Sequence, residues 1–166
     1  MVKAPNAWDV AAAVPDPELP MVTLADLGIL RDVEQHGDAV AVTITPTYSG
    51  CPAMREISHD LRHRLTQAGF ADVTVRTSLA PAWSSDWITD DGRSKLSAAG
   101  IAPPNPAGRR SAGPIPLSLS VRSRTVVCPR CSSTDTRETS AFSATACKAL
   151  YRCTACDEPF EYVKEI

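Results

Sequence analysis

The chain has 166 residues, of which 43% are hydrophobic and 22% are charged, and its formal net charge at pH 7 is −2. This composition is ordinary for a globular protein with one medium domain or two small ones. No run of about 18 apolar residues occurs, so the sequence predicts no membrane-spanning helix, and no signal-peptide hydrophobic region is evident. We therefore expect a cytoplasmic protein. Its six cysteines would then be reduced, which favours metal binding or reactivity over disulfides.

Charge is distributed unevenly along the chain. Residues 1–101 carry eight basic and thirteen acidic side chains, whereas residues 102–166 carry nine basic and six acidic ones. Such asymmetry suggests two parts with different roles. The arginine-rich stretch of residues 102–131 is either a solvated linker or a contact surface. Because the sequence pI is about 5.9 and nucleic-acid-binding domains usually exceed about 9, we expect no nucleic-acid partner.

The first part predicts alternating helices and strands. A short helix is expected over residues 7–14, before prolines that stop it. A hairpin follows over residues 29–45, with its turn at His36–Asp38 and apolar residues at alternating positions in its second strand. The segment between them, residues 16–20, predicts a turn or capping loop.

A longer helix is expected from Pro52 to Gly69, since these residue types suit the first and the terminating positions of a helix. Its apolar residues recur every three or four positions: Met54, Ile57, Leu61, Leu65 and Ala68. A strand over residues 71–80 and a short helix over residues 90–101 complete the order. This order predicts an α+β domain in which helices cover one face of a mixed three-stranded sheet.

We expect three segments along the chain: the α/β domain over residues 1–104, a linker rich in proline and arginine over residues 105–124, and a four-cysteine ribbon over residues 125–166. Four cysteines in the ribbon have the spacing C-x2-C-x21-C-x2-C: Cys128, Cys131, Cys153 and Cys156. Two such turns can place four thiolates around one tetrahedral ion, so the spacing predicts a zinc ribbon built of short β-hairpins. A tail this short needs such a staple to fold.

Zinc is preferred over iron in this ribbon because four thiolates close its coordination shell and make an inert structural site, although all-thiolate sites also hold iron. Ser132 and Asp157 occupy positions where a glycine often follows the second cysteine of each pair. Cys147 either replaces a ligand or, as we prefer, is a small buried apolar residue.

Cys51 directly precedes the helix expected at Pro52. Unpaired N–H groups and the helix dipole stabilise a thiolate at such a place. The residue could be a nucleophile, a transient metal ligand or a packing residue. His59 and His63 lie four residues apart on the polar face of the helix and could bind metal, but no third ligand is apparent and no base lies beside Cys51. We interpret both histidines as solvated and Cys51 as a transient ligand.

Several segments resemble, in order and spacing, a family of small domains linked to iron–sulfur cluster assembly and represented by the SufT-type proteins. The resemblance covers about residues 5–104 and rests on DPELP (16–20), LADLGIL (24–30), TPTYSGCP (45–52) and the segment 79–104. With the four-cysteine tail and its phrase FSATACKALYRCTACDEPFEYVKEI (142–166), the whole chain resembles the D-subunit family of the phenylacetyl-CoA epoxidase systems.

The resemblance implies a small α/β fold and a non-catalytic accessory role in aerobic phenylacetate degradation. It matches the family's acidic motif to Asp16 and Glu18 and its cysteine to Cys51, and so implies transient binding of iron or an iron–sulfur cluster. It also implies partners: the di-iron oxygenase and the flavin and iron–sulfur reductase of the epoxidase complex, whose iron centres this protein would mature or repair. A purely structural subunit is the alternative, and a homo-oligomer stays open.

Catalysis of the epoxidase reaction itself is not expected of this chain. It has one Glu-x-x-His sequence, Glu56 to His59, whereas a di-iron centre uses two of them on different helices. It also has no glycine fingerprint for a flavin or a nicotinamide.

Overall fold

The computed structural model describes residues 6–106 and 125–166. The chain divides into two compact units, Met1–Ala99 with Ile166 and Gly100–Glu165. The boundary that we expected after residue 104 therefore falls earlier, because β4 (Ile101–Ala102) pairs with β7 (Pro159–Val163) of the second unit. The linker expected over residues 105–124 lies mostly outside the described residues.

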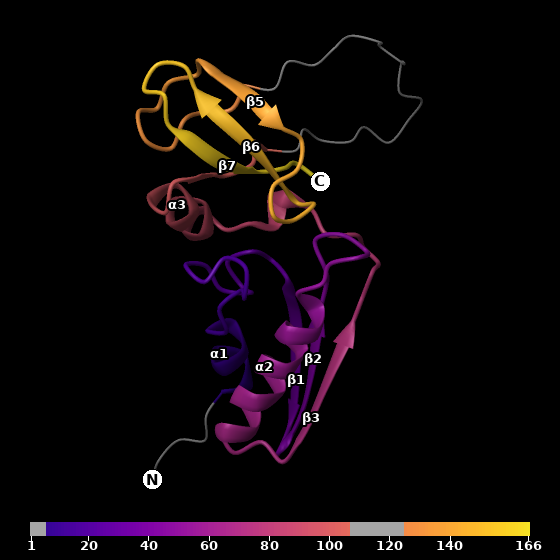
Figure 1. The fold of residues 1–166 in the computed structure, drawn as a ribbon. Coiled ribbons are helices and arrows are strands. Elements are labelled where there is room, and N and C mark those ends of the chain that lie inside the picture. The colour runs from indigo at the N-terminus through magenta and orange to yellow at the C-terminus, as the bar shows by residue number, and fades with distance from the viewer. Residues whose placement is uncertain (1–5, 107–124) are drawn as a thin grey trace. The chain divides into compact units, whose positions relative to one another are not determined.

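The first unit contains the mixed three-stranded sheet that the sequence predicted (Figure 1). β1 (Leu30–His36) and β2 (Ala39–Ile44) form an antiparallel hairpin, and β2 pairs in parallel with β3 (Asp72–Thr77). α2 (Met54–Gln67) makes the crossover between the two parallel strands. A parallel pair needs such a crossover, because its strands run in the same direction and a tight turn cannot join them.

Two helices cover one face of this sheet. α1 (Ala7–Ala12) contacts α2 and β1, and α2 contacts β3. The alternating residues Val40, Val42 and Ile44 of β2 are buried, as the period of two predicted. The buried apolar stripe of α2 is narrower than expected and consists of Ile57, Leu61 and Leu65.

The start of α2 differs from the prediction by about one half-turn. The helix begins at Met54 after the capping residue Ala53, so Pro52 lies in the turn before it. The backbone carbonyl of Cys51 accepts a hydrogen bond from the Met54 N–H (3.5 Å). Cys51 therefore lies one short turn ahead of the helix rather than at its cap.

The loop before β1 is tied to the C-terminal part of the first unit. Trp83 is buried, and its indole N–H donates to the Leu27 carbonyl (2.9 Å). α3 (Asp90–Ala98) begins after Thr89, whose hydroxyl accepts from the Gly92 N–H (3.0 Å). The Lys95 ammonium lies 2.9 Å from the buried carboxylate of Asp26. This ion pair fastens α3 to the loop.

Acid should weaken this attachment. Burial opposes ionisation of Asp26, but hydrogen bonds from the Thr23 backbone N–H and from Lys95 hold the pKa of this carboxyl below its usual value. A carboxylate of this kind stabilises the fold above its unfolded-state pKa, and its contribution is lost as the pH falls through the lower folded-state pKa. We expect the free energy of unfolding to fall more steeply with acid in the natural protein than in an Asp26→Asn variant.

Urea unfolding followed by tryptophan fluorescence at several acidic pH values measures this difference. All three tryptophans, Trp8, Trp83 and Trp87, belong to the first unit. Asp91→Asn is the matched control, because Asp91 pairs with the same lysine but its side chain is 70% exposed, and exposed pairs contribute little. Equal acid slopes in the natural protein and Asp26→Asn would contradict the assignment.

The second unit is a four-stranded sheet of order β4-β7-β6-β5, where β5 is Thr136–Ser140 and β6 is Lys148–Cys153. Its antiparallel pairs, β5 with β6 and β6 with β7, are the short hairpins expected of a ribbon. Its core is a small cluster of buried residues: Ala102, Val126, Cys128, Ala149, Tyr151, Cys153, Phe160 and Tyr162. Within the part of the chain that the structure describes, no helix is both long enough and apolar enough to span a membrane.

Candidate metal centre

Two similar turns present the four ribbon cysteines. In the first, the Cys128 N–H donates to the Ser133 carbonyl (2.9 Å) and the Ser132 N–H donates to the Cys128 carbonyl (2.9 Å). In the second, the Cys153 N–H donates to the Glu158 carbonyl (2.9 Å). Each C-x2-C segment is thus folded back on itself by backbone hydrogen bonds, and both of its sulfurs lie on the same side of a tight loop.

Ser132 and Asp157 explain how these turns close without glycine. Their φ angles are 61° and 60°, in the left-handed region that glycine adopts most easily. Both residues directly follow the second cysteine of a pair. Asp157 also pairs with Arg152 (3.1 Å), and serine and aspartate tolerate this conformation better than bulky residues do. The departure from glycine noted in the sequence therefore leaves the geometry of the turn intact.

Residues 125–128, which precede the first turn and lie within the described part of the chain, form no strand. Val126 is buried, and its carbonyl accepts a hydrogen bond from the Thr136 hydroxyl (2.7 Å). The Thr136 side chain thus makes the hydrogen bond that a backbone N–H of a neighbouring strand would otherwise make. Before the second turn, by contrast, β6 runs up to Cys153.

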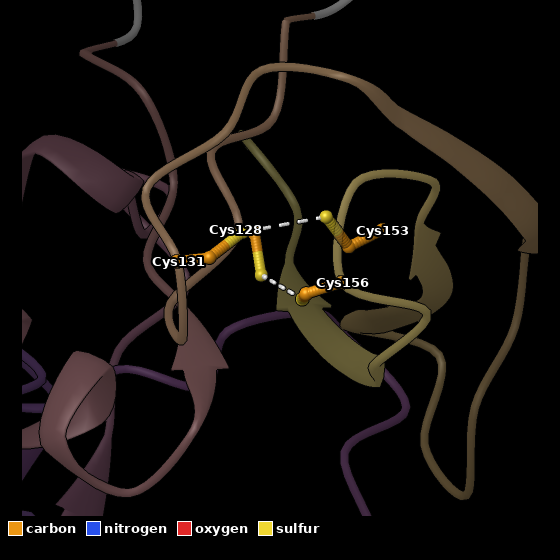
Figure 2. A group of neighbouring side chains, drawn as sticks. All are labelled: Cys128, Cys131, Cys153 and Cys156. Atoms are coloured by element: carbon orange, nitrogen blue, oxygen red, sulfur yellow. Dashed lines mark hydrogen bonds between the residues drawn. The ribbon is translucent and has the colours of Figure 1, made fainter.

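The four sulfurs converge, as Figure 2 shows. All lie within 4.8 Å of one another. The Sγ atoms of Cys128 and Cys156 are 3.8 Å apart, and those of Cys131 and Cys153 are 3.6 Å apart. None of the six cysteines, all of which lie among the described residues, forms a disulfide, and these separations far exceed a disulfide bond of about 2 Å.

The separations fit one tetrahedral metal ion. Four sulfurs about 2.3 Å from a zinc ion define a tetrahedron with edges of about 3.8 Å. Cys128 and Cys153 are buried, whereas Cys131 and Cys156 are exposed at the surface. The donor set is therefore complete, wholly sulfur and half enclosed by the ribbon core, which matches a structural zinc site.

The pKa values of Cys153 and Cys156 support this fit. Burial opposes ionisation of Cys153, but backbone N–H groups of Cys156 and Ala155 and neighbouring thiols lower its pKa to about 7. The Glu158 N–H favours a Cys156 thiolate, yet desolvation and the other three sulfurs together raise the pKa of Cys156 to about 12. The sulfurs cannot all carry a negative charge at neutral pH by themselves. A divalent cation between them would remove this repulsion.

Cys147 does not belong to this group. It is half-buried, and its sulfur lies 3.2 Å from the Thr145 hydroxyl. Within the described residues, the cysteine cluster consists of the four residues of the two C-x2-C pairs.

The structure does not bring the other three candidate ligands together. Cys51 is half-buried, and its backbone N–H donates to the Tyr48 carbonyl (3.1 Å). Asp16 is buried, and its Oδ1 accepts hydrogen bonds from the N–H groups of Glu18 and Leu19 (both 2.9 Å). Among the described residues, these three side chains form no group with ligand atoms within 4.8 Å of one another. In this structure Asp16 therefore stabilises the loop that contains Glu18 and Leu19.

A second cluster of potential ligands lies on α2. Glu56, His59 and Asp60 place ligand atoms within 4.8 Å of one another. This group contains His59 but not His63, so it supplies no third ligand to the pair of histidines that the sequence suggested. Sequence reasoning did not single out Glu56 or Asp60 beside His59. Helical spacing was the missed signal, since residues three and four apart share a face.

Comparison with known proteins agrees with this division of the chain. A family model described as "Iron-sulfur cluster assembly protein" matches residues 8–76, and one described as "PaaD zinc beta ribbon domain" matches residues 113–164. A crystal structure of a domain of unknown function, DUF59, from Bacillus anthracis has 27% identity and a TM-score of 0.51. The match covers 54% of this chain and 87% of that one.

Two curated relatives extend the comparison. An Escherichia coli (strain K12) protein, named as the putative D subunit of 1,2-phenylacetyl-CoA epoxidase, is 45% identical over 157 residues, which cover 95% of this chain and 90% of that protein. A Porphyromonas gingivalis (strain ATCC BAA-308 / W83) protein named "Fe-S protein maturation auxiliary factor" is 33% identical over 83 residues, which cover 49% of this chain and 78% of that protein.

The fold and the sulfur cluster thus define a class: proteins that join an α/β domain of the iron–sulfur cluster assembly type to a zinc β-ribbon. Within this class, the chain belongs to the PaaD family, the family of phenylacetyl-CoA epoxidase D subunits.

Proposed function

We propose that this protein is an accessory subunit of a phenylacetyl-CoA epoxidase complex that matures or repairs the iron or iron–sulfur centres of that complex. One observation carries the proposal: a single chain contains a closed four-sulfur cluster and, apart from that cluster, a half-buried cysteine in a domain of the iron–sulfur assembly type. The names of the curated relatives support both parts of the role.

The ribbon cluster is proposed to be a structural zinc site. Its ligands would be Cys128, Cys131, Cys153 and Cys156. A zinc ion held by four thiolates has no open position for a substrate, so it stabilises the fold and does no chemistry. Arg130 of the first turn and Glu158 beyond the second form an ion pair (3.3 Å), which also joins the two turns.

Cys51 is proposed to hold the cargo, iron or an iron–sulfur cluster, for a short time. The residue is only half-buried, and the proposal requires its sulfur to meet an incoming ion and then a client protein. The turn before α2 places it close to the N–H groups at the start of the helix, which favour negative charge. Asp16 and Glu18 would join as oxygen ligands when cargo binds. One thiolate and a few carboxylate oxygens form an incomplete shell, which suits release.

The proposed clients are the di-iron oxygenase and the flavin and iron–sulfur reductase of the complex. The protein would have no catalytic activity of its own. Ligand exchange at Cys51, without electron transfer, is sufficient for delivery of an ion or cluster.

Cys51→Ser tests this role. Serine keeps the size of the side chain but is a poorer ligand for iron. We expect the iron content of oxygenase and reductase purified from cells with this variant to fall to the level found in cells that lack the protein altogether. The measurement is iron per protein by elemental analysis, together with epoxidase activity.

Cys147→Ser is the matched control, because Cys147 is also half-buried and lies outside the four-sulfur cluster. Asp16→Asn examines the acidic motif: asparagine retains an oxygen that can accept from the Glu18 and Leu19 N–H groups but loses the charge. Iron occupancy and activity unchanged in Cys51→Ser would remove this residue from the function.

A scaffolding role is the second candidate, and exposed apolar side chains on the ribbon favour it. Phe142 is 64% exposed and Val127 is 46% exposed, and side chains of this kind often lie in protein interfaces. If the protein only holds the complex together, zinc removal should abolish co-elution with the partners in size-exclusion chromatography. Cys51→Ser should then leave iron occupancy intact.

A further inference from the structure

Four potential metal ligands line one exposed stripe of α2: Glu56, His59, Asp60 and His63. The ligand atoms of the first three lie within 4.8 Å of one another. His59 Nδ1 is 3.6 Å from the Asp60 carboxylate. The imidazole rings of His59 and His63 stack in parallel, with their centroids 6.2 Å apart and an interplanar angle of 5°.

The charges of this stripe are unusual for a solvated helix. Glu56 and Asp60 are one turn apart, and like charges at this spacing destabilise a helix. Arg55, Arg62 and Arg64 flank the stripe, yet no ion pair joins them to the two carboxylates in the part of the chain that the structure describes. A cation bound between the carboxylates and the imidazoles would remove the repulsion.

The helix backbone that carries the stripe is held in place by the core. The opposite face of α2 carries the buried residues Ile57, Leu61 and Leu65, so the backbone that positions the ligands is held by the core. The ligands themselves face water: the side chain of His59 is 74% exposed and that of Asp60 is 33% exposed. An ion held there would retain water ligands and exchange readily.

We propose that this stripe is a second metal site, one that binds a single borderline divalent cation such as Fe²⁺, Co²⁺, Ni²⁺ or Zn²⁺ reversibly. Imidazole nitrogen suits these metals. His63, which is not in the group of three, would have to turn toward the ion to complete a set of two histidines and a carboxylate, a donor set typical of Fe²⁺. The site differs in chemistry from the all-sulfur cluster of the ribbon. It goes beyond the proposed function, because it requires neither Cys51 nor a client protein.

Cobalt titration of the full-length protein, free of any affinity tag and with zinc already bound to the ribbon, tests the site. We expect one equivalent of Co²⁺ to bind without the sulfur-to-cobalt charge-transfer absorption of a thiolate site. Paramagnetic broadening should affect the NMR signals of two of the three imidazoles. In His59→Ala and in His63→Ala, affinity should fall by about tenfold or more, a loss of about 1.4 kcal/mol or more of binding free energy.

His36→Ala is the matched control, since the third histidine of the chain lies at the end of β1, outside the stripe. Alanine favours a helix, so the two α2 variants should remain folded. Three results would each overturn the proposal. They are an equal loss of Co²⁺ affinity in His36→Ala, an unchanged Co²⁺ affinity in His59→Ala and His63→Ala, and no binding of Co²⁺ to the protein whose ribbon already holds zinc. Cys51→Ser should still bind this cobalt ion, so that failure of this site and failure of the proposed function are distinguishable.

Discussion

Replacement of Cys128 by serine should abolish metal binding by the ribbon and unfold the second unit. Cys128 is buried, belongs to the small ribbon core and lies 3.8 Å from the sulfur of Cys156. Structural zinc sites contribute about 10–16 kcal/mol of apparent binding free energy in small zinc-finger peptides. The eight buried residues of the ribbon core cannot replace a term of this size, because a unit this small buries little apolar surface.

Metal analysis and NMR of the purified variant measure this effect. The natural protein should contain about one zinc per chain, and Cys128→Ser should contain none and lose the dispersed amide signals of β5, β6 and β7. Tryptophan fluorescence, which reports on the first unit, should change little. Cys147→Ser makes the same chemical change in the same unit outside the cluster and should keep both metal and fold. A folded, metal-free Cys128→Ser ribbon would contradict the zinc assignment.

The second large effect is expected from Gly28→Ala. Gly28 has a φ of +66°, and a Cβ atom there would lie 2.5 Å from the Trp87 Cβ and 2.8 Å from the Trp87 carbonyl oxygen. The left-handed conformation costs a side-chain-bearing residue about 1–2 kcal/mol, and overpacking adds about 1–3 kcal/mol. Trp87 also stacks under the Arg31 guanidinium (3.6 Å to the ring centroid), so its displacement would disturb the start of β1.

Gly37→Ala isolates the conformational part of this effect. Gly37, in the turn between β1 and β2, has a φ of +62°, but nothing lies within 4 Å of the position that a Cβ atom would take there. Urea unfolding followed by tryptophan fluorescence should show a clearly larger loss of unfolding free energy in Gly28→Ala than in Gly37→Ala. Equal losses of unfolding free energy in the two variants would show that the close contact between Gly28 and Trp87 does not restrict the residue at position 28 to glycine.

The sequence predicted correctly those features that depend on residues close together in the chain. The alternation in β2 and the apolar stripe of α2 predicted their burial, because one face of each element must leave water whatever the partner is. The C-x2-C pairs were likewise readable, since the short loop itself directs two sulfurs to one side. Ser132 and Asp157 were correctly noted as glycine-like positions, although the sequence alone did not reveal that they adopt the left-handed conformation.

What the sequence by itself determined is therefore the order of α-helices and strands in the first unit up to α3, its mixed three-stranded sheet and the four-sulfur cluster. The tertiary structure alone decided that β4 pairs with β7 and so moves the domain boundary to Ala99. It also decided that the Trp83 indole N–H donates to the Leu27 carbonyl and that Lys95 pairs with Asp26. The physical reason is that pairing, hydrogen bonding and side-chain convergence depend on which segments meet in space, and local propensity carries no information about those meetings.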